Sequence, residues 1–132
     1  MDKLEATKLA NQADQMQAEP QKDTITFEDF TKMDIRSGVI LEATKMPKAK
    51  KLLVLKVDTG IDVRTIVSGI AEHYSPEEVV GKRVSVLVNL APRKLRGVES
   101  EGMILMADTK DGGLAFIQAD SDKEVNNGVQ IS

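Results

Sequence analysis

Two clusters of positive charge in this 132-residue sequence have residue types that bind phosphate. The first, "KMPKAKK", has four lysines in seven positions, and the second, "APRKLRGVESE", has two arginines and a lysine in four. Arginine presents a planar fork of donors that fits phosphate oxygens, and lysine presents a mobile point charge. The lysine cluster alone is typical of a solvated surface loop. Together they predict two cationic loops that bracket a phosphate backbone, and in the first loop we assign this role to Lys45, Lys48 and Lys51.

The sequence contains no residue pattern typical of catalysis. The absence of cysteine excludes disulfides, thiolate nucleophiles and cysteine-ligated zinc. The single histidine, His73, stands before a short helical turn and is interpreted as structural or solvated. Ser68 lies at a strand end with no base assigned to it, and Asp58 and Asp62 flank a turn that they are expected to shape. No glycine-rich phosphate loop or nucleophile elbow is present, so we predict no catalytic site, no metal and no cofactor.

Length and charge predict one soluble domain with a basic middle. The net charge is -3, yet residues 24–105 contain 13 basic and 11 acidic side chains, and both flanking parts are acidic. A basic patch on an acidic protein favours a local anionic partner. No stretch approaches the roughly 18 apolar residues of a membrane span, and the N-terminus lacks a secretory core. We therefore expect a cytoplasmic protein with no membrane partner.

The order of the predicted elements is that of an OB-fold. Strands are predicted in the segments "IRSGVILEAT", "LLVLKVDTG", "VRTIVSGI", "RVSVLVNLA" and "GMILMAD". A helical turn falls between the third and fourth strands, with Ser75 as cap, Pro76 in the first position and Gly81 as stop. This layout predicts an all-β, five-stranded Greek-key barrel in which the two basic loops are the ligand-binding loops.

Both ends of the chain extend beyond the predicted barrel. Residues 1–23 are expected to form a linker or frayed helical tail, because their apolar stripe is thin, and residues 24–132 are expected to form the OB-fold domain. Thr26 and Asp29 resemble a helix-start cap, and Phe27 and Phe30 are expected to be core residues of that turn. "GLAFIQAD" and "GVQIS" are predicted as weaker extra strands at the C-terminus.

Aromatic content limits how a nucleic acid could be bound. Single-strand-binding OB-folds stack bases on aromatic rings. This chain has three Phe, one Tyr and no Trp, and none falls in the predicted binding strands. Recognition of a folded RNA through its shape and its phosphates is therefore favoured over stacking.

Three segments together resemble a known family: "DIRSGVILEATKMPKAKKLLVLKVDTG", "RTIVSGIAEHYSPEEVVGK" and "VLVNLAPRKLRGVESEGMIL". They are similar to the tRNA-binding domain at the C-terminus of many bacterial methionyl-tRNA synthetases, of free-standing dimeric tRNA-binding proteins and of endothelial monocyte-activating polypeptide. The resemblance implies an OB-fold with a C-terminal segment that forms a homodimer. It also implies structure-selective binding to the outer corner of tRNA, without chemistry.

The resemblance also implies roles for individual residues. Arg36 matches a D-x-R motif, Asn89, Arg93 and Lys94 match the loop after strand four, and Ser100 and Met103 match an S-x-G-M motif. Arg93 and Lys94 are then phosphate contacts, and Asn89 and Ser100 are polar contacts. The first loop departs from the family pattern, because Met46-Pro47 replaces a His-Pro pair and Lys50 replaces an acidic residue.

Three functions remain open from the sequence. The first is a non-catalytic domain that raises the tRNA affinity of a methionine–tRNA ligase, whose catalytic part would be a partner in the same chain. Residues 1–23 favour it, because they resemble the end of a helical linker. The second is a free-standing dimeric tRNA-binding protein. The third is a chaperone-like peptide-binding module, which should show an apolar groove, whereas the predicted face is basic and polar.

Overall fold

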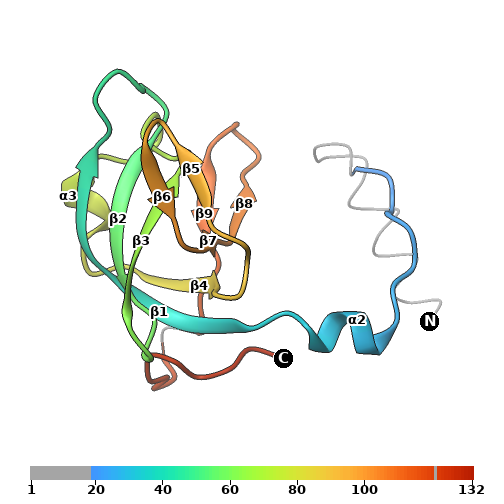
Figure 1. The fold of residues 1–132 in the computed structure, drawn as a ribbon. Helices are drawn as coiled ribbons and strands as arrows, with labels where there is room; N and C mark the ends of the chain where they lie inside the picture. The colour runs from blue at the N-terminus through green and yellow to red at the C-terminus, as the bar shows by residue number, and fades with distance from the viewer. Residues whose placement is uncertain (1–18, 121) are drawn as a thin grey trace.

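The computed structural model describes residues 19–120 and 122–132 (Figure 1). The larger part of the predicted N-terminal tail, residues 1–18, lies outside the described residues. The five strands of the main sheet are β1 Ile35–Lys45, β2 Leu53–Asp58, β3 Val63–Ser68, β4 Arg83–Leu87 and β7 Met103–Ile104. Two further pairs are β5 Arg93–Leu95 with β6 Val98–Ser100, and β8 Met106–Asp108 with β9 Leu114–Phe116.

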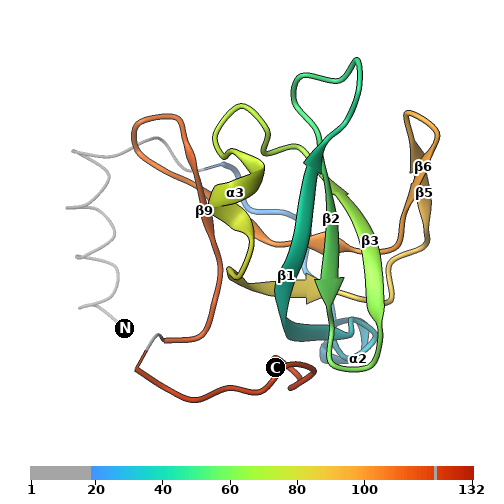
Figure 2. The same cartoon turned by 90° about the vertical axis from the view of Figure 1, so that its left-hand side faces the viewer.

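The main sheet curls into a nearly closed barrel with the strand order β3-β2-β1-β4-β7 (Figures 1 and 2). All of its pairings are antiparallel. β1 is long enough to pair with β4 through residues 35–39 and with β2 through residues 39–45, and a bulge between Ile40 and Glu42 bends it between the two. The amide of Glu101 donates to the carbonyl of Thr65 at 2.9 Å and joins the last strands to β3. The predicted all-β OB-fold is confirmed.

Buried and exposed side chains alternate along the strands, and the buried ones fill the barrel interior. In β2, Leu53, Leu55 and Val57 are fully buried, while Lys56 between them is exposed. The remaining core residues come from every other wall of the barrel and from the helix: Ile40, Ile66, Ile70, Val79, Val84, Val86, Val88 and Ile104. The core is almost entirely aliphatic, which agrees with the low aromatic content.

The short helix α3, Pro76–Val79, closes one end of the barrel at the predicted place. Ser75 and Glu78 form a capping box, and the hydrogen bond from the Ser75 backbone holds the pKa of the Glu78 carboxyl below its usual value. Val79, the last residue of the helix, is fully buried in the core. Gly81 ends it in the left-handed region, with φ of 87°.

The C-terminal segment runs along the first residues of β1, where β2 has already ended. Gly128 donates to the carbonyl of Ser37 at 2.8 Å, and Ile131 donates to that of Ile35 at 2.7 Å. Gly60 and Gly128 touch at the start of this segment, where a Cβ on Gly60 would lie 2.4 Å from the Gly128 backbone. The predicted strand at "GVQIS" is reduced to the single bridge between Arg36 and Gln130, and the predicted fifth strand is interrupted at Leu105 between β7 and β8.

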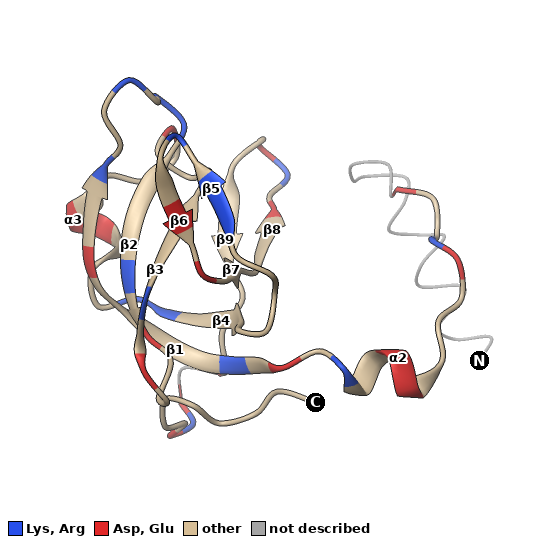
Figure 3. Ribbon diagram, in the orientation of Figure 1, with Lys and Arg blue, Asp and Glu red and all other residues tan. Residues whose placement is uncertain are grey.

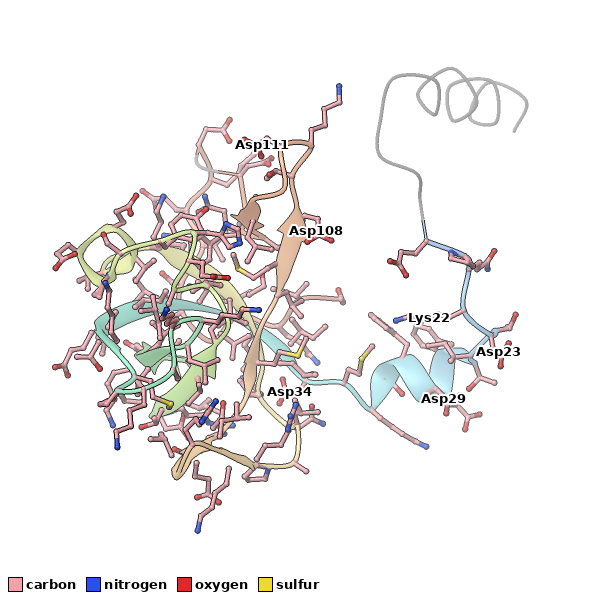
Figure 4. The ribbon with its side chains drawn as sticks, turned by 90° about the horizontal axis from the view of Figure 1, so that it is seen from above. Lys22, Asp23, Asp29, Asp34, Asp108 and Asp111 are labelled. Carbon is pink, nitrogen blue, oxygen red and sulfur yellow. The ribbon has the colours of Figure 1, made fainter. Side chains whose placement is uncertain are left out.

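The helix α2, Phe27–Thr31, begins at the expected cap but does not bury its aromatic rings. Thr26 and Asp29 form a capping box, whereas Phe27 is 78% exposed and no residue of α2 is buried. The prediction that Phe27 and Phe30 are core residues is wrong, because α2 lies on an arm beside the barrel and the two rings mainly meet each other, 6.2 Å apart. From above, Lys22, Asp23 and Asp29 lie clear of the barrel, and Asp34 lies where the arm joins it (Figure 4). No helix in the described ranges is long and apolar enough to cross a bilayer.

Candidate nucleic-acid interface

The second basic cluster forms a β-hairpin, where the sequence predicts only a loop. β5 pairs with β6 in the register Arg93↔Ser100, Lys94↔Glu99 and Leu95↔Val98. The two residues at the tip, Arg96 and Gly97, have φ of 51° and 84°. Two consecutive residues with positive φ are the requirement of a tight I′ hairpin turn. The hairpin therefore gives the side chains of Arg93 and Lys94 fixed positions on a strand, and both are exposed.

Arg64 of β3 holds both stems of this hairpin. One guanidinium nitrogen donates to the carbonyls of Val88 and Glu101, which lie just before and just after the hairpin. Its Nε donates to Asp62 at 2.9 Å, and this hydrogen bond holds the pKa of the Asp62 carboxyl below its usual value. The Arg64 side chain is 20% exposed. Arg64 is thus a positioning residue that the sequence did not reveal, because nothing in the pattern places residues 88 and 101 together.

Ser100 and Gly102 attach the second stem of the hairpin to the barrel. The Ser100 hydroxyl is buried, accepts from the amide of Val67 at 3.0 Å and donates to the carbonyl of Gly102 at 3.2 Å. A Cβ on Gly102 would lie 3.0 Å from the carbonyl oxygen of Leu87. The S-x-G spacing is therefore explained by packing. The serine hydroxyl accepts a hydrogen bond from a backbone amide of β3, and the glycine leaves room for the backbone of Leu87.

Asn89 attaches the first stem of the hairpin to the N-terminal arm. Its amide oxygen accepts from the backbone of Asp34 at 2.8 Å, and its amide nitrogen donates to the carbonyl of Lys32. The arm enters the barrel at this point. The side chain of Asn89 is therefore engaged within the protein, as is that of Ser100.

The lysine loop between β1 and β2 is ordered by its own backbone. Met46 is buried at its base, and its amide donates to the carbonyl of Leu52 at 3.2 Å. The amide of Ala71 donates to the carbonyl of Lys51 at 3.1 Å and ties the loop to the segment after β3. Four lysine side chains point outward from this frame and are exposed: Lys45, Lys48, Lys50 and Lys51. Because the loop is already ordered, binding would cost it little conformational entropy.

The two basic clusters converge at one end of the barrel. A surface pocket is lined by Lys48, Lys50 and Lys51 from the loop and by Arg96 from the hairpin tip. Figure 3 shows the Lys and Arg positions of this loop and of β5 at the same end of the ribbon. The ion pairs found within residues 19–120 and 122–132 involve Lys32, Arg36 and Arg64, so within this part of the chain the basic residues of the two clusters form no ion pair.

Arg36 is not brought to this surface. It lies near the start of β1, and about 30 Å of strand, at roughly 3.3 Å per residue, separates it from Lys45. Its guanidinium binds Asp34 at 2.9 Å and 3.1 Å and donates to the carbonyl of Gly128 at 3.1 Å. Arg36 thereby holds the C-terminal segment against the barrel.

Met103 lies in a cleft beside the hairpin. The cleft has a volume of about 280 Å³ and is bounded by the end of β3, the hairpin and β7. Arg93 and Ser68 contribute polar groups to its wall, and Leu90 and Met103 contribute exposed apolar side chains, 38% and 47% exposed. The site thus consists of exposed basic residues on two neighbouring loops, with a partly apolar cleft next to the hairpin.

Comparison with known proteins decides the family. Residues 35–130 match the family model described as "Putative tRNA binding domain". The chain belongs to this tRNA-binding-domain family. The match covers the whole barrel, the hairpin and the C-terminal segment that Arg36 holds.

Relatives of this tRNA-binding domain include ligases and separate small proteins. It is 74% identical over 132 residues to the methionine–tRNA ligase of Flavobacterium johnsoniae and spans 18% of that protein's length. A solved MetRS-related protein from Pyrococcus horikoshii is 38% identical, with a TM-score of 0.75, over 84% of this chain and 100% of its own. The CsaA chaperone protein from Picrophilus torridus is 30% identical, with a TM-score of 0.74, over 83% and 100% respectively.

Proposed function

We propose that this domain binds folded tRNA at its outer corner through shape and phosphate contacts and raises the tRNA affinity of a methionine–tRNA ligase. The observation that carries the mechanism is the convergence of two basic loops, whose cations form no ion pair with any other described residue, at one end of a barrel of the tRNA-binding family. Ordered cationic side chains at fixed spacing suit a preformed RNA surface better than a flexible strand.

The candidate residues divide into two proposed roles. The residues proposed to contact phosphates are Lys45, Lys48, Lys51, Arg93 and Lys94. Asn89 and Ser100 matched motifs that imply RNA contacts, but their side chains already make hydrogen bonds within the protein. We assign them, with Arg64, the role of holding the hairpin, and we assign Arg36 the role of holding the C-terminal segment.

A competition experiment tests binding to a folded RNA. Labelled tRNA bound to the domain is displaced with unlabelled tRNA or with an unstructured RNA of the same length. We expect tRNA to compete at least tenfold better, because the domain has few rings on which to stack splayed bases. Equal competition by the two RNAs would contradict the shape-based mechanism.

The parent protein is proposed from the relatives. The domain matches the C-terminal part of methionine–tRNA ligases, so we propose the catalytic part of such a ligase as its partner and the cytoplasm as its location. Residues 1–23 are proposed as the connecting segment, and residues 19–23 are exposed and without regular structure. Two alternatives are a free-standing tRNA-binding protein and a chaperone-like module. Both stay open, because the solved proteins of similar fold include a MetRS-related protein and a chaperone protein.

We also propose that the domain forms a homodimer through its C-terminal face. A groove of about 240 Å³ there is lined largely by apolar residues, among them Ile117, Val129 and Ile131, which are 43%, 45% and 39% exposed. The hydrogen bond between Ile131 and Ile35 places this face next to the arm that carries the exposed Phe27. Figures 1 and 2 both show the C-terminus beside α2. Such an exposed apolar surface is typical of a twofold interface.

Light scattering at micromolar concentration tests the dimer. The domain is expected to have twice the mass of one chain, and Ile117→Asp is expected to give a monomer, because it would bury a charge in each half of a symmetric contact. Leu41→Asp is the matched control, since Leu41 is 44% exposed on β1 and does not line the groove. A monomeric wild-type domain, or a dimer that survives Ile117→Asp, would contradict this interface.

A further inference from the structure

The cleft beside the hairpin has the composition of a site for a flat, partly polar group. Its lining includes Leu90 and Met103, whose side chains are exposed, and Met106. Ser68 and the backbone of Gly69 form part of its polar rim. A Cβ on Gly69 would meet nothing closer than the carbonyl of Lys51 at 4.0 Å, so the cleft is open above that residue.

The chemistry of the walls points to an aromatic ring as the occupant. A methionine sulfur contacts aromatic rings favourably at about 5 Å, with about 0.3 to 1.5 kcal/mol per contact. Met103 lies on the strand that follows the hairpin, so its position is fixed by the pairing Leu87↔Met103. Methionine can therefore supply here the contact that an aromatic side chain supplies in other OB-folds.

The charge around the cleft decides between a nucleobase and a peptide side chain. Arg93 lines the cleft and belongs to the basic hairpin. An apolar peptide side chain would fill the cleft but leave these cations unpaired. A nucleotide would satisfy both the cleft and the positive charge beside it, because its base enters the cleft while its phosphate reaches Arg93.

We propose that the cleft takes one unstacked nucleobase from a loop of the bound RNA, held against the Met103 thioether, with a phosphate of the same nucleotide on Arg93. This inference rests on the proposed function and adds to it a specific ligand class for the cleft that the basic hairpin borders. Bases that are splayed out of a folded RNA are available only in its loops. The cleft thus gives the domain a second means of preferring a folded RNA with a defined loop to a plain duplex.

The test combines Met103→Ala with abasic substitution in tRNA. Met103→Ala is expected to weaken tRNA binding about two- to tenfold without changing its salt dependence, because no charge is removed. Replacing loop nucleotides one at a time by abasic residues should identify a position that weakens the wild-type domain and leaves Met103→Ala unaffected. Leu41→Ala is the control, since Leu41 is 44% exposed on β1 outside the cleft, and it should bind like the wild type.

The outcomes separate this inference from the proposed function. If the wild-type domain does not bind tRNA, the proposed function fails. If it binds tRNA, but no abasic position discriminates the wild type from Met103→Ala, the nucleobase site is overturned while phosphate binding stands. A permanently reduced, unfolded protein tests whether the cleft binds peptide instead. If it displaces tRNA from the wild type and not from Met103→Ala, the cleft is a peptide site and the inference is likewise overturned.

Discussion

Replacing Arg93 and Lys94 together by alanine is expected to weaken the binding of many tRNAs about equally, by roughly 10- to 100-fold at low salt, because two charge-assisted phosphate contacts are lost. Both side chains are exposed on β5 and make no ion pair within the described residues. Their removal should therefore leave the fold and its melting temperature nearly unchanged. Filter binding with several tRNA species measures the loss.

The matched control for this variant removes the same charge elsewhere. Lys82 and Lys123 are exposed outside the two basic loops, and their double replacement by alanine changes the net charge by the same amount. We expect it to alter tRNA affinity by about twofold or less, since distant charges act only through a screened field. Equal losses in the two double variants would show that net charge, and not the hairpin, governs binding.

Replacing Arg64 by lysine should damage the interface without removing charge from it. Lysine has no planar fork, so it cannot reach the carbonyls of both Val88 and Glu101 while it also pairs with Asp62. An unsatisfied carbonyl at the base of the hairpin is expected to lower the free energy of unfolding by about 1 to 3 kcal/mol. The tRNA affinity should also fall, because the hairpin loses its fixed position. Urea unfolding and filter binding measure the two effects.

Arg83→Lys serves as the comparison for Arg64→Lys. Arg83 lies on β4 and donates to one carbonyl, that of Val125, from an exposed position. We expect this change to cost about 0.5 kcal/mol or less, as is usual for exposed surface substitutions. If Arg64→Lys is equally mild in both stability and binding, the hairpin does not depend on the fork of Arg64.

The elements that the sequence predicted are those set by local signals. The alternation of Val84, Val86 and Val88 predicts a strand, and these valines are buried, although β4 ends at Leu87 and Ser85 is buried as well. Ser75 with Pro76 specifies the start of a helix. The strand order of the OB-fold followed from the count of strands and the place of that helix. These features depend on neighbours in sequence, and the structure bears them out.

The features that the sequence did not reveal depend on contacts between distant residues. The β5–β6 hairpin has strands of three residues and a turn of Arg96 and Gly97, which lacks the Asn-Gly or Asp-Gly signal of tight hairpins. The exposure of Phe27 depends on where the arm lies, and its local pattern resembles that of a buried helix. The burial of Ser100 depends on the hydrogen bond that its hydroxyl accepts from the amide of Val67 in another strand.

The salt dependence of tRNA binding tests the central claim most directly. With Lys45, Lys48, Lys51, Arg93 and Lys94 on phosphates, a plot of log affinity against log salt should fall with a slope of about -3 to -5 for the wild type. The slope of the variant without Arg93 and Lys94 should be shallower by about 2. A wild-type affinity that does not change with salt, or a slope that the double replacement leaves unaltered, would contradict phosphate binding by these two loops.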